Sequence, residues 1–126
     1  MNKYHFLNII TAVNVLVALG FAIAGVVNPS LIVPAHDAKD PAAEVFAMYT
    51  LARALPMVLL TLMAIFRKNG KQHIVTLALL AGLIQLMDGC IGIYLKEPTK
   101  TIGPFVLAAA TFIAVYLVRN VKPMSN

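Results

Sequence analysis

Two ionisable residues, Arg53 and Asp88, lie deep inside long apolar segments of this chain. In a bilayer, such a residue costs roughly 2.5–3.5 kcal/mol at the centre of a helix, so it normally faces a bundle interior or a wet cavity and has a partner. A guanidinium and a carboxylate together can form an ion pair, hold the polar group of a ligand or take part in proton transfer. The chemistry of this sequence therefore starts from these two residues.

The spacing of the two charges predicts that they share a depth in the membrane. Arg53 is nine residues after Glu44, and Asp88 is eight residues before Lys96. At ~1.5 Å per residue, both lie about 12–14 Å from the same end of their segments. The segments are joined by a short turn, so we expect adjacent antiparallel helices with axes about 8–10 Å apart. The sequence therefore predicts that Arg53 and Asp88 meet.

Other polar residues could extend the pair into a pocket. Tyr49 is four residues before Arg53, and Gln85 is three residues before Asp88, so each shares a helix face with its charge. Two more polar residues stand at middle depth in the first and last apolar segments. The predicted ligand-binding residues are Arg53, Asp88, Tyr49, Gln85, Asn14 and Thr111.

Three structural interpretations of the charged residues stay open. The pair can fix the register of two helices, because removing one partner of a buried ion pair leaves a costly lone charge. It can bind a ligand or substrate. The third interpretation is that Arg53 and Asp88 do not meet at all.

Four functions are compatible with these residues. The leading hypothesis is a small membrane protein that binds a lipophilic or amphiphilic small molecule at Arg53 and Asp88. The second is a proton-coupled transporter, against which the nearby Arg53 weighs. The third is an isomerase or cyclase that uses Asp88 as acid or base on a lipid-like substrate, although only Tyr49 offers a second catalytic group. The fourth is an accessory subunit of a membrane complex.

Composition places these residues in a membrane. The chain has 126 residues, of which 60% are hydrophobic and 12% charged, and its mean hydropathy is +0.85. Soluble domains average about 25% charged residues. A soluble chain of this length would have too few polar residues to cover its surface. We therefore expect a single transmembrane domain over residues 1–126.

Four apolar runs predict the spans, at about 6–27, 43–66, 74–95 and 102–118. Their lengths match the ~20 residues that cross the hydrocarbon core as a helix. Asp40 and Pro41 are typical of a helix start, and Thr101 is a candidate cap for the last helix. The predicted fold is an all-α integral membrane protein, an up-and-down bundle of four transmembrane helices.

Lysine and arginine placement predicts the orientation. Six basic residues fall at one end of the spans: Lys3, Arg67, Lys68, Lys71, Arg119 and Lys122. The other end has Lys39, Lys96 and Lys100, together with four of the five acidic residues. This bias favours both termini in the cytoplasm, in the inner membrane if the source is bacterial. The net charge of +5 then reflects contact with the lipid bilayer rather than with nucleic acid, for which the chain has no stacking platform.

No metal site or cofactor is expected. Cys90 is the only cysteine, and His5, His36 and His73 do not share helical spacing. Small residues recur in the third and fourth spans at Ala78, Ala81, Gly82, Gly89, Gly92, Ala108, Ala109, Ala110 and Ala114. Such residues let membrane helices approach closely. They predict packing within one bundle, with a homodimer interface as the alternative.

The order of features resembles the DoxX-like and related small four-helix bacterial membrane proteins. The resemblance depends on the loop from Asn28-Pro29 to Pro41, on Tyr49-Thr50-Leu51-Ala52-Arg53, and on the single acid in Gln85-Leu86-Met87-Asp88-Gly89. It covers nearly the whole chain, but the first span lacks the arginine found in DoxX itself. The resemblance implies an architecture and no defined activity.

Overall fold

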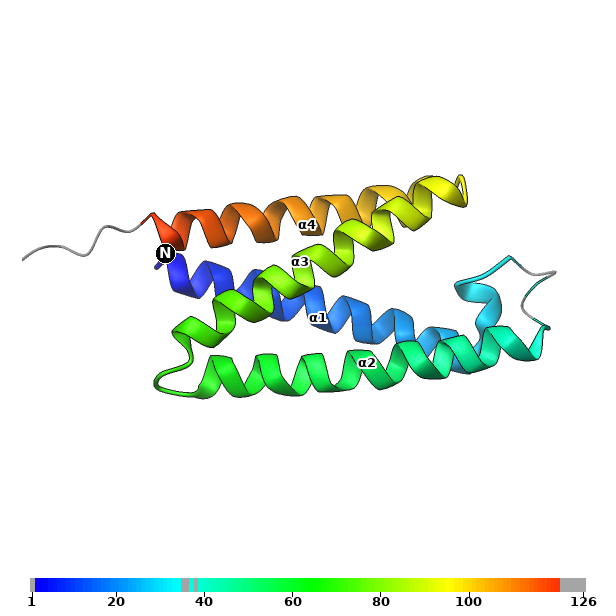
Figure 1. Ribbon diagram of the computed structural model, residues 1–126, viewed down its shortest axis with the longest axis horizontal. Helices are drawn as coiled ribbons and strands as arrows, with labels where there is room; N and C mark the ends of the chain where they lie inside the picture. The colour runs from blue at the N-terminus through cyan, green and yellow to red at the C-terminus, as the bar shows by residue number, and fades with distance from the viewer. Residues whose placement is uncertain (1, 35–36, 38, 121–126) are drawn as a thin grey trace, which may run out of the picture.

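The computed structural model describes residues 2–34, 37 and 39–120, and the described chain is helical. The four α-helices are α1 (Lys3–Val27), α2 (Pro41–Phe66), α3 (Lys71–Tyr94) and α4 (Pro98–Arg119), and a short 3-10 helix, η1 (Pro29–Leu31), follows α1. Consecutive helices run in opposite directions, so α1 begins at the end of the bundle where α4 ends (Figure 1). His36 and Lys122 lie outside the described residues.

Each of the four α-helices is long and apolar enough to cross a membrane. Large apolar side chains cover the outside of the bundle, and among those more than half exposed are Phe21, Leu59, Phe66 and Ile113. Soluble monomers rarely expose continuous apolar surface on this scale. The outer surface is therefore suited to lipid, and the chain has the features of a multi-pass membrane protein.

Every helix begins before the apolar run that predicts it. The start of α1 moves from residue 6 to Lys3, and the start of α4 moves from residue 102 to Pro98. The first four N–H groups of a helix have no partner within the helix, so polar residues and proline fit in the first turn. A hydropathy pattern does not detect that turn.

The side chains at the helix starts agree with the sequence in one case and differ in another. The Asp40 carboxylate accepts a 2.9 Å hydrogen bond from the N–H of Ala42, with Pro41 at the first helical position, as predicted. The prediction that Thr101 caps the last helix is wrong. Thr101 lies inside α4, and its hydroxyl donates a 2.9 Å hydrogen bond to the carbonyl of Glu97, the residue just before the helix.

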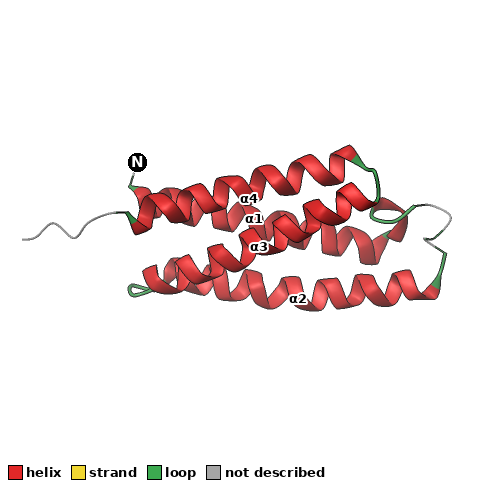
Figure 2. Ribbon diagram, turned by 45° about the horizontal axis from the view of Figure 1, so that its top comes forward, coloured by secondary structure: helices red, strands yellow, loops and turns green. Residues whose placement is uncertain are grey.

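The helices pack as two close pairs. α3 packs most extensively on α4, and α1 on α2, while α1 also contacts both α3 and α4. Among the described residues α2 and α4 do not pack on each other, and α2 and α3 share the smallest helix–helix contact. α2 and α3 are close at the turn that joins them and diverge along their length in both views (Figures 1 and 2). Of the sequential pairs, only α2 and α3 are therefore poorly packed on each other away from their turn.

Small residues bring α3 and α4 together. Gly82 and Gly89 lie against the rings of Phe112 and Phe105 from α4. A Cβ at Gly92 would collide with the backbone carbonyl of Lys100, so only glycine fits at this crossing. The prediction that the small residues of the third span pack within the bundle is confirmed, because all five of them are buried.

The apolar core is concentrated near the α2–α3 turn. Its larger cluster contains Leu7, Ala64, Ile74, Ala78, Ala114, Val115 and Val118. A smaller cluster joins Val15, Val58 and Ala81 at middle depth. The residues that α2 contributes come from its second half, and those of α3 from its first half. Beyond this level no core cluster of described residues joins α2 to α3, which is why the two helices separate there.

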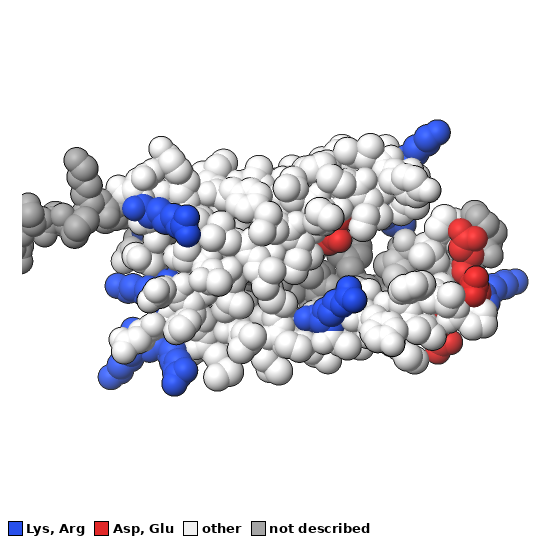
Figure 3. Space-filling model, viewed as in Figure 1, with Lys and Arg blue, Asp and Glu red and all other residues white. Residues whose placement is uncertain are grey.

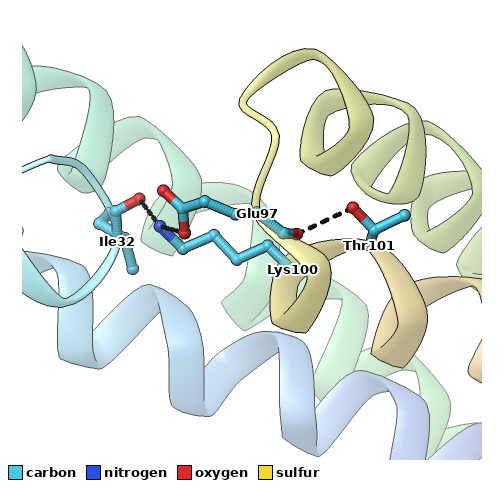
Figure 4. Close-up of polar contacts among 4 residues, drawn as sticks. All are labelled: Ile32, Glu97, Lys100 and Thr101. Carbon is cyan, nitrogen blue, oxygen red and sulfur yellow. Dashed lines mark hydrogen bonds and ion pairs between the residues drawn. The ribbon is translucent and has the colours of Figure 1, made fainter.

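The opposite end of the bundle is closed by a polar contact. The ammonium of Lys100, in the first turn of α4, donates a 2.8 Å hydrogen bond to the carbonyl of Ile32 just after η1. The same ammonium lies 2.7 Å from a carboxylate oxygen of Glu97 (Figure 4). Lys100 therefore ties the α1–α2 connection to the start of α4.

Candidate functional site

A buried hydrogen-bond network joins three helices at the centre of the bundle. The amide Nε2 of Gln85 in α3 donates to Oδ1 of Asn14 in α1 at 2.8 Å. Asn14 Nδ2 in turn donates to the hydroxyl of Thr111 in α4 at 3.2 Å. Thr111 donates its own proton to the carbonyl of Leu107 at 2.7 Å. All three polar side chains are at most 4% exposed.

This network satisfies polar groups that would be costly in hydrocarbon. Asn14 uses both ends of its amide, and the Thr111 hydroxyl both accepts and donates. Hydrogen bonds between membrane helices contribute about 0.6 kcal/mol on average and up to about 1.7. The network fixes the mutual register of α1, α3 and α4, and it does not include α2.

The predicted ion pair between Arg53 and Asp88 is not formed. Both residues are exposed, and among the described residues neither charged group makes an ion pair or a hydrogen bond. The physical reason is the divergence of α2 and α3, because the small residues of α3 pull it toward α4 at the level of Asp88. The predicted depth does not by itself set the distance between the helices.

Arg53 and Asp88 nevertheless lie on faces of α2 and α3 that are directed toward each other. A cavity of about 310 Å³ separates α2 from α3 near their turn, and Leu60, Ala64 and Leu77 are among the residues that line it. Arg53 precedes Leu60 by seven residues and Ala64 by eleven. Spacings of seven and eleven return to one face of a helix. Arg53 therefore extends the cavity-lining face of α2 toward the diverging end.

The same relation holds on α3. Asp88 follows Leu77, which lines the same cavity, by eleven residues, and it follows Ala81, which belongs to one core cluster with Val58 of α2, by seven. Asp88 thus extends the α3 face that turns toward α2. We call the space between these two faces, at the level of Arg53 and Asp88, the α2–α3 cleft. Figure 3 shows a hollow between α2 and α3, with basic atoms on its α2 side and acidic atoms on its α3 side.

Two further polar groups belong to the α2 side. Tyr49 is 60% exposed and lies one turn before Arg53 on the same face. Pro56 is inside α2 and has no N–H, so the carbonyl of Ala52 lacks its usual helical donor. The cleft therefore offers a cation and a phenol on α2, opposite a carboxylate on α3.

The predicted six-residue pocket is therefore divided into two sets. Asn14, Gln85 and Thr111 are brought together in the interior, while the groups on the cleft are exposed on α2 and α3. Sequence reasoning grouped them because depth along a helix can be read from spacing. It could not show that Gln85 is buried against Asn14 of α1 while Asp88, three residues later, is exposed.

Other chemistry is sparse in the described part of the chain. No group of three or more His, Cys, Asp or Glu residues there could hold a metal ion. Cys90 is exposed and free. The Thr61 hydroxyl in α2 is buried without a partner among the described residues.

Comparison of the chain with protein-family models, curated proteins and solved structures finds no match. The resemblance to DoxX-like proteins therefore stays a prediction.

Proposed function

We propose that this protein is an integral membrane protein that binds a lipophilic or amphiphilic small molecule in the α2–α3 cleft. The polar group of the ligand contacts Arg53 and Asp88, and its apolar part lies along the exposed flanks of α2 and α3. Arg53 supplies donors to an anionic or carbonyl group, and Asp88 accepts a hydrogen bond or orients the ligand.

One observation carries this proposal. Arg53 and Asp88 are the only charged residues well inside the spans, they lie on facing walls, and neither has a protein partner among the described residues. Charges in hydrocarbon normally mark a substrate or ion path, or else pair with each other. Because Arg53 and Asp88 do not pair with each other, a bound molecule is the best remaining way to offset the cost of their charges in hydrocarbon.

The interior network supports the proposal by joining three helices through buried hydrogen bonds. Asn14, Gln85 and Thr111 hold α1, α3 and α4 in register, while α2 is attached mainly to α1 and to the turn. A ligand enters between α2 and α3 from the side, in the plane of the bilayer, because these two helices have the least contact of the helix pairs that touch. The amide network thus positions the α3 wall without touching the ligand.

Native mass spectrometry of the protein purified from its own membranes in mild detergent tests the proposal. We expect wild type to retain a small molecule and Arg53→Ala to lose it at least tenfold, since a hydrogen bond to a charged group contributes about 1.5–3 kcal/mol. Leu59→Ala is the control, because Leu59 is 61% exposed on another face of α2. Equal retention by both variants would contradict the proposal, as would a wild type with no ligand. A dimer mass without ligand would instead assign the cleft to a second copy of the chain.

Proton transport is a second candidate, favoured by one observation. The Asp88 carboxylate has no partner among the described residues, so the argument that Arg53 holds it in an ion pair no longer weighs against a proton relay. Proteoliposomes containing Asp88→Asn should then lose a substrate-coupled proton flux that wild type shows. A wild type that moves no protons with any of a panel of amphiphilic substrates removes this candidate.

The orientation belongs to the same proposal. Five basic residues of the described chain gather where α1 begins and α4 ends: Lys3, Arg67, Lys68, Lys71 and Arg119. The positive-inside rule supports placing this end in the cytoplasm, and in bacteria the membrane would be the inner one. Reporter fusions after Asn120 that are active only in the periplasm should be silent. An active fusion reverses the orientation.

A further inference from the structure

A second hollow lies where the start of α1 meets the α2–α3 turn. Its volume is about 140 Å³, and three cationic residues, Arg67, Lys68 and Lys71, are among those that line it. Asn8 of α1 adds a side-chain amide to the same lining. We call this feature the basic hollow. It is at the opposite end of α2 and α3 from the diverging part that forms the cleft.

The cations of the basic hollow have no anionic partner among the residues that the structure describes. The chain has five acidic residues. Four of them, Asp37, Asp40, Glu44 and Glu97, belong to the opposite end of the bundle, and Asp88 is in the second half of α3. Among the described residues, Arg67, Lys68 and Lys71 make no ion pair or side-chain hydrogen bond. Figure 3 shows basic atoms gathered at this end without acidic atoms beside them. The basic hollow is therefore open to an external anion.

Local structure holds these cations together. The turn after α2 is tight, because Gly70 packs so closely on the carbonyl of Ala64 that no Cβ fits. Its N–H donates to the carbonyl of Arg67 at 3.1 Å. The ammonium of Lys71 lies 5.0 Å from the centre of the Tyr4 ring, a cation–π contact that joins α1 to the turn. The cations therefore converge in the folded state before any ligand arrives.

The floor of the basic hollow is apolar. Ala64, Ile65 and Ile74 line it beneath the cations, and Ile74 is 1% exposed in the larger core cluster. α2 ends and α3 begins at this level, so the hollow is at the membrane–water boundary. A ligand here meets positive charge on its outer side and hydrocarbon on its inner side. That order of groups matches the phosphate and acyl chains of a phospholipid.

We propose that the basic hollow binds the phosphate group of an anionic phospholipid. Arg67, Lys68 and Lys71 contact the phosphate oxygens, Asn8 donates a further hydrogen bond, and the acyl chains descend along the outside of the bundle. Basic pockets between membrane helices suit such headgroups, and each nearby Lys or Arg adds about fivefold to the affinity. This site is separate from the α2–α3 cleft and does not depend on a ligand there.

Native mass spectrometry of delipidated protein, titrated with phosphatidylglycerol or with phosphatidylcholine, tests the proposal. Wild type should bind one phosphatidylglycerol in preference to phosphatidylcholine. The double variant Lys68→Gln/Lys71→Gln should bind phosphatidylglycerol ~25-fold more weakly, from about fivefold per lysine. Both lysines are exposed, so the variant is expected to fold. Arg53→Ala should bind this lipid like wild type, which distinguishes the site from the cleft.

The matched control is Lys39→Gln/Lys96→Gln, which removes the same charge at the other end of the bundle, where both lysines are exposed. It should bind phosphatidylglycerol within about twofold of wild type. Equal losses of phosphatidylglycerol affinity in the two double variants would mean that the lipid is attracted by the net positive charge of the protein, and this would overturn the site. Thermal stabilisation by inorganic phosphate alone, equal to that by the lipid, would overturn the assignment to a phospholipid.

Discussion

Gln85 of α3 and Asn14 of α1 are joined by a 2.8 Å hydrogen bond between two nearly fully buried side chains. The two residues are 71 positions apart in the sequence, so the bond forms only when the first and third helices have packed. Asn14 also donates a hydrogen bond to the hydroxyl of Thr111 in α4. The consequence is a bundle in which buried hydrogen bonds fix the mutual register of α1, α3 and α4, while α2 takes no part in this network.

Asn14→Ala should destabilise the protein by about 1–3 kcal/mol. The substitution leaves the Gln85 amide and the Thr111 hydroxyl without their buried partner, and the cost of such an orphaned group is in that range. The free energy of unfolding, measured in mixed micelles with increasing dodecyl sulfate, checks it.

Two further variants sharpen this measurement. Asn14→Leu/Gln85→Leu should lose less stability than Asn14→Ala, because replacing both partners by apolar groups leaves only the Thr111 hydroxyl to rearrange. Thr50→Val serves as the control, since Thr50 is exposed and bonds only to the carbonyl of Phe46 in its own helix. If Asn14→Ala is no less stable than Thr50→Val, the network does not hold the helices.

Gly92→Ala should lower the thermal midpoint of the protein in detergent. A Cβ at Gly92 would overlap the backbone of Lys100, which cannot move without shifting the start of α4, and overpacking of this kind costs about 1–3 kcal/mol. Gly103→Ala is the matched control in the neighbouring helix, because a Cβ there meets nothing within 4 Å. It should be neutral or stabilising by about 0.5–1 kcal/mol. The reverse order of the two midpoints would contradict the α3–α4 crossing.

Lys100→Met should loosen the segment that follows α1. The substitution removes the hydrogen bond to the carbonyl of Ile32 and the ion pair with Glu97. Amide hydrogen exchange of residues 30–33 is then expected to become several-fold faster than in wild type, while exchange in the middle of α1 is unchanged. Lys96→Met is the comparison, because Lys96 is exposed at the same end and its side chain makes no hydrogen bond or ion pair among the described residues. Equal exchange in the two variants would show that Lys100 does not hold this segment.

The sequence predicts the helices better than it predicts how they pack. Hydropathy and length define four spans, and Asp40 with Pro41 marks one start correctly, because these features depend on local chemistry alone. Depth is also local, so Arg53 and Asp88 can be compared along their helices. The helix on which α3 packs depends instead on contacts between residues far apart in the sequence. It follows from the fit of Gly82 and Gly89 against Phe112 and Phe105 of α4, and this fit takes α3 away from α2.

The residues of the candidate site could be predicted from the sequence, but their grouping could not. Asn14, Gln85 and Thr111 are recognisable in the sequence as polar residues at middle depth, and three such residues in one bundle are expected to find each other. Their separation from Arg53 and Asp88 depends on rotation about the helix axes. Two residues three apart, such as Gln85 and Asp88, differ by only about 60° in direction. In a bundle that difference is enough to place one inside and the other on the cleft.

A double-mutant cycle between Arg53→Met and Asp88→Leu distinguishes the open cleft from a register-fixing ion pair. In delipidated protein we expect a coupling free energy below about 0.5 kcal/mol, because groups without direct contact behave additively. An ion pair in the bundle interior predicts instead that each single substitution costs about 3–5 kcal/mol and that the second substitution restores much of it. The free energy of unfolding of the four proteins in one detergent gives the answer. A coupling above about 1.5 kcal/mol would bring α2 and α3 together at this level and leave no room for a ligand between them.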